Sequence, residues 1–342
     1  MVKKVLLTLF VLFIAGMVIY AGGKKEAEPA PEEVAEEDVE DMAEEEEAAE
    51  EEGPQGTGIA YKAPIDIGTK NFTEQFVVGN LMYIYLEEEG FDVALKTGMT
   101  STVLREAMEN GDLDLCMDYT GTQWLSYTGH EFKGESPKEM YRKAKESDAE
   151  RGLIWMDPIW CNNTYAIAVT REFSEKNGIK TLSDFADYVK SQEGEVRFAS
   201  DFEFYSRPDG LLALQQHYDF VLKPEYVSTA LPGLSYEPLI KGRADFAMVF
   251  GTDSIIQAED WVVLQDDKNF WPPYDLAPYT RLEVLEANPG LDEALNRLVN
   301  AFPDDPAEAR SEMSGLNAKV DIDKMEPEEA AEEWLKEKGL ID

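Results

Sequence analysis

The fold is decided by residues 65–75, which read Ile65-Asp66-Ile67-Gly68-Thr69-Lys70-Asn71-Phe72-Thr73-Glu74-Gln75. Apolar side chains alternate at the start of this stretch and predict a short strand, which ends in a glycine-containing turn. The residues that follow predict a helix over 73–89, because apolar side chains recur on one face and Gly90 provides a stop. The polar and aromatic residues in between therefore lie at a strand end, where open α/β sheets bind ligands.

The same alternation of strand and helix extends along the rest of the chain. A strand is predicted at 91–95, a helix at 101–110 that stops at Gly111, and a strand at 113–117. The pattern continues through 153–156, 165–170, 183–190, 196–199, 209–218 and 246–249. The last 65 residues are expected to be mostly helical, ending in a helix with Trp334 and Leu335 on its apolar face. Such alternation predicts an α/β fold with two lobes.

The N-terminus has the character of an export signal. Lys3 and Lys4 precede an apolar run from Val5 to Ile19, and small residues follow it. This order predicts a signal peptide over residues 1–21. An uncleaved anchor is the alternative, although the run is shorter than the roughly 20 residues of a membrane span. No cysteine stands at the end of the run, so a lipid anchor is not supported.

Residues 22–58 are predicted to be an acidic, disordered linker. Residues 24–58 contain 16 acidic and 2 basic residues and no aromatic residue. Such a composition offers no apolar surface for packing and repels itself. It serves either as a tether that holds the folded part away from the membrane or as a solubilising tail.

The overall composition excludes several classes of partner. The net charge of -39 provides no basic surface for nucleic acid or for anionic lipid headgroups. It favours a soluble monomer. The two cysteines, Cys116 and Cys161, either form a disulfide or remain as buried free thiols.

Motifs of catalysis are absent from the sequence. The only histidines are His130 and His217, and there is no HExxH, CxxC, GxSxG or phosphate-binding loop. The sequence therefore predicts a protein that is not an enzyme and that needs neither a metal nor another cofactor.

Six segments combine polar, aromatic and glycine residues at predicted strand ends, namely residues 68–75, 118–122, 162–165, 203–210, 250–253 and 266–274. In this order and spacing they resemble the glycine betaine/choline-binding subunits of osmoprotectant ABC importers. The corresponding family patterns are G-[ST]-K-x-[FN]-x-E-Q, E-Y-T-G-T, N-x-T-Y-A, E-F-x-x-R-x-D-G, T-D and D-D-K-x-x-x-P-P-Y. The similarity runs from about Ile65 to Leu340.

This resemblance implies a type II periplasmic-binding-protein fold, in which two α/β lobes joined by a two-stranded hinge close on a ligand. The first lobe would comprise residues 60–162 plus 275–342, and the second lobe residues 163–274. The chain departs from its relatives at Gly98-Met99-Thr100-Ser101, where they usually have L-G-G-T or L-G-T-T, and at Asp118, which replaces a glutamate. The loop at 98–101 could therefore reach the ligand through Met99 or Ser101.

The resemblance also implies ligand-binding residues, and the chemistry of the ligand agrees with them. A trimethylammonium group has no N–H to donate, so aromatic faces attract it, with about 0.5–2 kcal/mol per contact. Carried over by position, Tyr119, Tyr165 and Tyr274 form the walls of a cage, and Phe250 stands where many relatives have tyrosine. Lys70, Thr122 and Arg207 match the positions that hold the ligand carboxylate, for which arginine provides a bidentate donor.

Structural roles are the alternatives for these residues. Tyr165 begins an apolar strand and could belong to the core, whereas Lys70 and Arg207 could be surface charges. Thr122 could cap the turn after Gly121. Trp124 lies near the expected pocket, but packing on a helix face is the preferred explanation for it.

The sequence therefore predicts an exported solute-binding protein of an ABC importer, acting in the periplasm or at the extracellular face of the membrane. Its ligand would be a quaternary ammonium osmoprotectant, with glycine betaine favoured over choline because of the three carboxylate-binding residues. Its partners would be the permease and ATPase subunits. The alternative is a sensing module that binds the same compounds and docks on a signalling receptor, since the fold and pocket would be the same.

Overall fold

The computed structural model describes residues 62–207 and 209–342 of the chain. The predicted signal or anchor segment (1–21) and the predicted linker (22–58) lie outside these residues. Within the described part, none of the helices combines the length and the apolar character needed to span a bilayer.

The first of two sheets contains five strands in the order β2-β1-β3-β10-β4. The strands are β1 (Ile65–Lys70), β2 (Val93–Met99), β3 (Leu115–Tyr119), β4 (Leu153–Trp155) and β10 (Leu276–Arg281). β1 is parallel to β2 and β3, whereas β10 is antiparallel to β3 and β4. The sequence analysis did not predict β10, which returns from the second sheet and occupies a position inside the first.

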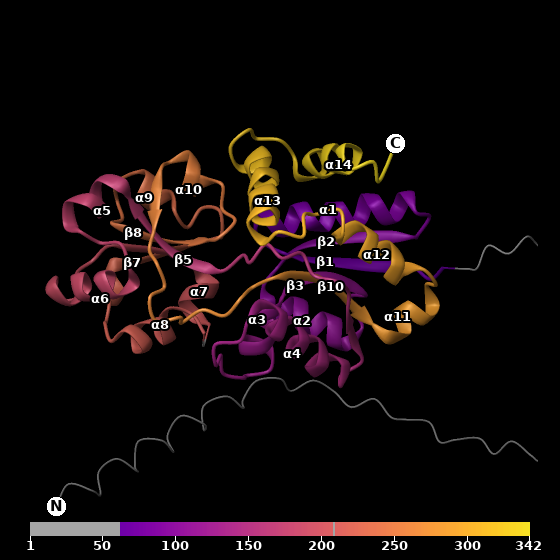
Figure 1. Cartoon of the computed structure of the whole chain (residues 1–342), viewed down its shortest axis with the longest axis horizontal. Coiled ribbons are helices and arrows are strands. Elements are labelled where there is room, and N and C mark those ends of the chain that lie inside the picture. Colours follow the sequence, from indigo (N-terminus) through magenta and orange to yellow (C-terminus); the bar gives the residue numbers. More distant parts are fainter. Residues whose placement is uncertain (1–61, 208) are drawn as a thin grey trace, which may run out of the picture. The chain divides into compact units, whose positions relative to one another are not determined.

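Helices cover both faces of this sheet. They are α1 (Thr73–Glu88), α2 (Ser101–Asn110), α3 (Thr120–Thr122), α4 (Pro137–Ala149), α11 (Leu282–Ala287), α12 (Leu291–Val299), α13 (Pro306–Asp321) and α14 (Pro327–Glu337), with a π-helical turn at Gln123–Tyr127. α1, α13 and α14 lie on one face, and α2 and α4 lie on the other (Figure 1). The predicted stop of α2 is confirmed, because Gly111 adopts a left-handed conformation with φ 82°.

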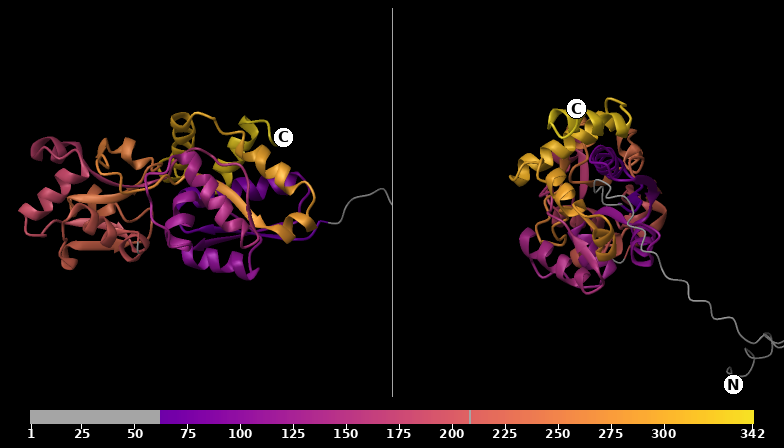
Figure 2. Two further views of the ribbon diagram at one scale, coloured as in Figure 1. Left: turned by 60° about the horizontal axis from the view of Figure 1, so that its bottom comes forward. Right: turned by 90° about the vertical axis from the view of Figure 1, so that its right-hand side faces the viewer.

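The second sheet also has five strands, in the order β7-β6-β8-β5-β9. The strands are β5 (Tyr165–Thr170), β6 (Phe198–Asp201), β7 (Val227–Ala230), β8 (Phe246–Phe250) and β9 (Trp261–Val263). Its helices are α5 (Arg171–Asn177), α6 (Leu182–Ser191), α7 (Phe202–Ser206), α8 (Leu211–Tyr218), α9 (Glu237–Ile240) and α10 (Ile255–Ala258). Two further views of the chain show this grouping of helices and strands around each sheet (Figure 2).

The chain crosses between the sheets twice, after β4 and again after β9. The two crossing segments pair with each other through an antiparallel bridge between Ile159 and Leu276. The N–H of Asn163 also donates to the carbonyl of Tyr274 at 2.9 Å. The predicted α/β class with two lobes and a two-stranded connection is therefore confirmed. The exact lobe bounds given above remain a prediction.

Apolar side chains from the predicted faces fill the interior. Ile65 and Ile67 of β1 are fully buried in one cluster with α1 side chains, and Trp334 of α14 stacks on Phe302 with ring centroids 4.4 Å apart. Each methylene removed from such a core costs about 1 kcal/mol. Cys116 and Cys161 are both buried and free, so the disulfide alternative is wrong.

Candidate functional site

All seven residues that the sequence analysis assigned to a ligand site line one pocket, namely Lys70, Tyr119, Thr122, Tyr165, Arg207, Phe250 and Tyr274. Strand ends place several of them. Lys70 ends β1, Tyr119 ends β3, and Phe250 ends β8 beside Tyr165 in the antiparallel ladder. The fold thus brings side chains from both sheets together, while their contact with a ligand remains a prediction.

Aromatic rings form much of the pocket wall. The ring of Tyr165 lies 5.3 Å from that of Phe250 and 5.7 Å from that of Tyr274, which it meets nearly edge-on at 81°. Phe72 stacks on Phe250 at 5.0 Å and on Tyr119 at 6.2 Å, measured between ring centroids. Five rings are therefore linked in one continuous group, which we name the aromatic wall (Phe72, Tyr119, Tyr165, Phe250 and Tyr274).

The sequence analysis did not assign Phe72 to the site, although a signal for it was present. Phe72 is the N-cap residue of α1 and makes no side-chain cap hydrogen bond. Serine, threonine, aspartate and asparagine are the usual residues at that position. A residue that breaks such a local rule is a candidate for a functional or a strained position.

A glycine allows Tyr274 its place in the aromatic wall. A Cβ atom added to Gly121 would lie 2.8 Å from two ring carbons of Tyr274 and 2.9 Å from the carbonyl oxygen of Pro273. No real side chain tolerates such distances without a shift of its neighbours. The glycine between Thr120 and Thr122 is therefore required for packing the ring.

Lys70 already has an anionic partner. Its Nζ lies 2.5 Å from Oδ1 of Asp118, and both side chains are buried. The hydroxyl of Tyr127 donates to the other carboxylate oxygen of Asp118 at 2.6 Å. The Lys70 Nζ also lies 5.1 Å from the ring centroid of Tyr119. A ligand carboxylate would therefore meet an ion pair here and not a free ammonium group.

Arg207 is paired in the same way. Its Nε and Nη2 donate to the carboxylate of Asp209 at 2.8 and 2.6 Å, and Nη1 donates to the hydroxyl of Tyr165 at 3.2 Å. The side chain of Asp209 is 9% exposed, and this residue lies two positions away in the chain. This bidentate pair orients the guanidinium against the aromatic wall, with its carbon 5.5 Å from the Tyr165 centroid.

Further polar residues of the pocket come from both lobes. Asp201, Glu203, Ser101 and Asn163 contribute to the lining, and burial raises the pKa of Asp201 to about 6. Ser101 belongs to the loop that departs from the family pattern, and its N–H donates to Glu203 at 3.2 Å across the lobes. Of the two residues considered there, the structure places Ser101 in the pocket lining and not Met99.

Trp124 does not belong to this lining. Its ring stacks on His130 with centroids 3.9 Å apart, and its Nε1 donates to the carbonyl of Glu131 at 3.2 Å. Among residues 62–207 and 209–342, there is also no group of three histidine, cysteine, aspartate or glutamate side chains that could hold a metal ion.

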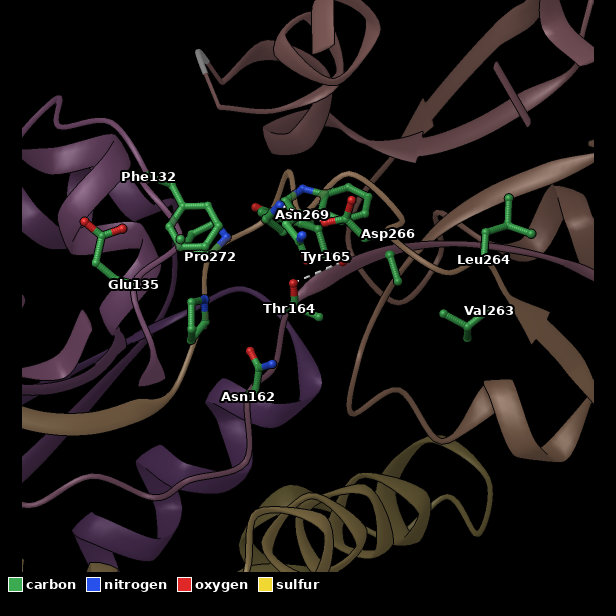
Figure 3. Close-up of a pocket in the computed structure, with 14 residues that line it drawn as sticks. Phe132, Glu135, Asn162, Thr164, Tyr165, Val263, Leu264, Asp266, Asn269 and Pro272 are labelled. Atoms are coloured by element: carbon green, nitrogen blue, oxygen red, sulfur yellow. Dashed lines mark hydrogen bonds between the residues drawn. The ribbon is translucent and has the colours of Figure 1, made fainter. Parts of the chain in front are cut away.

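A second pocket shares Tyr165 with the first and is lined by residues of the crossing segments, including Asn162, Thr164 and Pro272 (Figure 3). Its two carboxylates are engaged elsewhere. Glu135 is paired with Lys143 at 2.5 Å, and Asp266 accepts from Tyr218 at 2.5 Å. Both carboxylates of this pocket are therefore already paired within the protein.

Asp253, which follows β8, should make stability depend on pH. Burial raises the pKa of Asp253 from 3.8 to about 8. The folded chain then binds the proton more tightly than the unfolded chain, so the stabilisation is complete below about pH 4 and declines as the pH rises toward 8, at up to about 1.4 kcal/mol per unit. We expect Asp253→Asn to flatten the decline in the free energy of unfolding between pH 5 and 8, measured by urea denaturation.

Asp260→Asn is the matched control for this experiment. Asp260 is exposed, and its hydrogen bond to Arg171 lowers its pKa, so it does not titrate in this range. Its variant should keep the slope of the parent protein. A slope for Asp253→Asn equal to that of the parent would contradict the assignment.

Comparison with known proteins gives the architecture and the pocket a family context. Residues 63–337 match the family described as the substrate binding domain of ABC-type glycine betaine transport system. A glycine-betaine-binding protein of Pseudomonas aeruginosa is 33% identical over 290 residues, which cover 83% of this chain and 91% of that protein. A chemotactic signal transduction system substrate-binding protein of Halobacterium salinarum is 29% identical over 254 residues, 70% of this chain and 75% of that one.

A solved structure supports the same conclusion. A crystal structure described as that of a glycine betaine/carnitine/choline ABC transporter superimposes with a TM-score of 0.64 at 27% identity, covering 82% of this chain and 100% of that chain. The type II periplasmic-binding-protein fold expected from the sequence is thereby confirmed. The chain belongs to the family of substrate-binding domains of ABC-type glycine betaine transport systems.

Proposed function

We propose that this chain is the extracytoplasmic receptor of an ABC importer. It binds a quaternary ammonium osmoprotectant in the pocket that the aromatic wall lines. The observation that carries the proposal is the convergence of five aromatic rings from both lobes on one pocket. Aromatic faces are the surfaces that attract a cation without N–H donors. The protein would bind reversibly, catalyse nothing, act as a monomer and deliver its ligand to a permease and ATPase.

Glycine betaine is the ligand that we propose first. Its carboxylate would be held by Lys70, Thr122 and Arg207, which lie in the same pocket as the rings. Hydrogen bonds between ionised partners are roughly twice as strong as neutral ones. The carboxylate would therefore add affinity that choline, which has a hydroxyl in its place, cannot obtain.

Choline is the second candidate, favoured by the anionic surroundings of the pocket. Lys70 is paired with Asp118 and Arg207 with Asp209, and the lining adds Asp201 and Glu203. Two cations thus stand beside four carboxyl groups. Such surroundings favour a ligand with a net positive charge over a zwitterion.

Calorimetric titration with glycine betaine, choline, carnitine, proline betaine and proline tests both candidates. If Lys70, Thr122 and Arg207 hold the ligand carboxylate, an arrangement that we name the carboxylate clamp, glycine betaine should bind more tightly than choline. Equal affinities, or tighter binding of choline, would rule out the carboxylate clamp. Binding of the ammonium group by the aromatic wall would remain supported. Absence of binding by every quaternary compound would overturn the proposed function. Recovery of each ligand unchanged after long incubation is the expected result for a protein without catalytic activity.

A sensing role for the same ligands is the second candidate function. The similarity to a substrate-binding protein of a chemotactic signal transduction system favours it. The pocket would serve either role, so the protein to which this chain docks distinguishes import from sensing. Genes for a permease and an ATPase beside this one would support import, whereas a receptor gene in their place would support sensing.

The proposed function also includes export of the chain directed by residues 1–21, with or without cleavage of that segment.

A further inference from the structure

Glu74 is a buried carboxylate that does not line the pocket. It is the second residue of α1, its exposed fraction is 2%, and it lies four residues after Lys70. A carboxylate in such a place is costly unless hydrogen-bond donors surround it. The identity of those donors indicates what the residue does.

Four side chains donate to Glu74, two to each oxygen. Oε1 accepts from the hydroxyl of Tyr119 at 2.7 Å and from Nδ2 of Asn163 at 3.0 Å. Oε2 accepts from the hydroxyl of Thr252 at 2.5 Å and from Nδ2 of Asn317 at 3.3 Å. We name these five residues the Glu74 node, and every one of them is buried.

The donors of the Glu74 node come from different parts of the fold. Tyr119 ends β3 in the first sheet, Asn163 lies on a crossing segment, and Thr252 follows β8 in the second sheet. Asn317 lies on α13 and also donates to the carbonyl of Thr252 at 3.2 Å. The N–H of Thr252 in turn donates to Asn163 at 3.4 Å. One carboxylate thus joins a ring of the aromatic wall to the segment that enters the second lobe.

Burial raises the pKa of Glu74, while its four hydrogen-bond donors lower that pKa and favour the ionised carboxylate. A carboxylate suits these four donors better than an amide would. A carboxylate only accepts, and its two oxygens can serve all four donors. A glutamine would direct its own N–H groups at two of those donors. Each hydrogen bond to a charged acceptor contributes more than a neutral one, so the node resists rearrangement at either end.

We propose that Glu74 is a positioning residue that makes the orientation of Tyr119 in the pocket depend on the docking of Thr252, and with it the second lobe, against the first. The inference rests on the proposed function, because it assumes that Tyr119 contacts the ligand. Tyr119 and Thr252 bond to different oxygens of Glu74, so each can be altered alone.

A double-mutant cycle in ligand affinity tests the coupling. Tyr119→Phe keeps the ring and removes the donor to Oε1, together with the acceptor for Nε2 of Gln75. Thr252→Val keeps the shape and removes the donor to Oε2. We expect each change to weaken binding of glycine betaine or choline by about 10-fold. The affinity of the double variant should fall by about the same factor as that of either single variant, and not by the product of the two. Either change alone already breaks the link between Tyr119 and Thr252 through Glu74. Additive losses, or two variants with parent affinity, would overturn the proposal.

Thr280→Val is the matched control. Thr280 is fully buried in β10, and its hydroxyl donates to the carbonyl of Asp114 at 2.6 Å within the first lobe. Its variant also loses one buried hydroxyl donor, but the acceptor is a neutral carbonyl and not a carboxylate, so it should lose no more thermal stability than Thr252→Val. Only Thr252→Val should change ligand affinity. An equal loss of affinity in both would assign Thr252 a merely structural role.

A measurement without ligand separates this inference from the proposed function. Spin labels at Glu106→Cys on α2 and Glu175→Cys on α5, both at exposed positions, report the distance between the lobes. We expect Thr252→Val to broaden or shift the distance distribution of the ligand-free protein, and Thr280→Val to leave it unchanged. Failure of every ligand to bind would refute the proposed function alone. An unchanged distribution in Thr252→Val would refute the coupling whether or not a ligand binds.

Discussion

Tyr274→Ala is expected to weaken the binding of glycine betaine and choline alike, by about 2- to 30-fold. Tyr274 is buried, meets Tyr165 nearly edge-on and packs against Gly121. The variant lacks the aromatic ring face of Tyr274, which would contact the ammonium group that both ligands share. It also lets water reach the place of that ring in the aromatic wall. Calorimetry with both ligands measures the loss. Loss of only one ligand would contradict a common cage.

Two variants control for the damage that any aromatic-to-alanine change does to a core. Tyr279→Ala removes another fully buried ring, which stacks on Trp155 at 5.1 Å outside the pocket lining. It should cost about 3–5 kcal/mol of stability and leave affinity unchanged. Tyr274→Phe keeps the ring and loses only a hydroxyl that lies 3.5 Å from Asp209, so its affinity should stay near that of the parent.

Arg207→Ala is expected to remove most of any preference for glycine betaine while changing choline affinity less. A bidentate bond between arginine and carboxylate contributes about 1.5–3 kcal/mol, or roughly a 10- to 100-fold preference. Paired titrations of the parent and the variant give the ratio of the two affinities. An unchanged ratio would show that Arg207 does not contact the ligand carboxylate.

The pairing with Asp209 provides the sharper variant. Asp209→Asn leaves the shape of the pair and removes the anion that competes with a ligand carboxylate for Arg207. Under the clamp hypothesis this change should tighten glycine betaine and weaken choline, so the affinity ratio should move in the direction opposite to Arg207→Ala. Arg105→Ala is the control for Arg207→Ala, because Arg105 holds the buried Asp148 in a comparable bidentate pair outside the pocket lining. It should leave the ratio of the two affinities unchanged.

Short-range patterns made much of the fold predictable. The strand at 65–70 and the helix after it follow from alternating and helical apolar periods, which depend only on neighbouring residues. β10 was not predictable in this way, since its six residues LAPYTR contain a proline and follow no clear alternation. Its place between β3 and β4 depends on pairing with strands more than 100 residues away.

The sequence alone indicated the α/β class through its alternation of strands and helices, and its resemblance to a known family indicated the seven residues that line the pocket. Only the tertiary structure decided what surrounds those residues. The carboxylates beside Lys70 and Arg207, the place of Phe72 in the wall and the Glu74 node all depend on distances between segments far apart in the chain. Residue identity fixes which side chains can carry charge, but the electrostatic energy of a pair depends on its separation and burial, which only the folded chain sets.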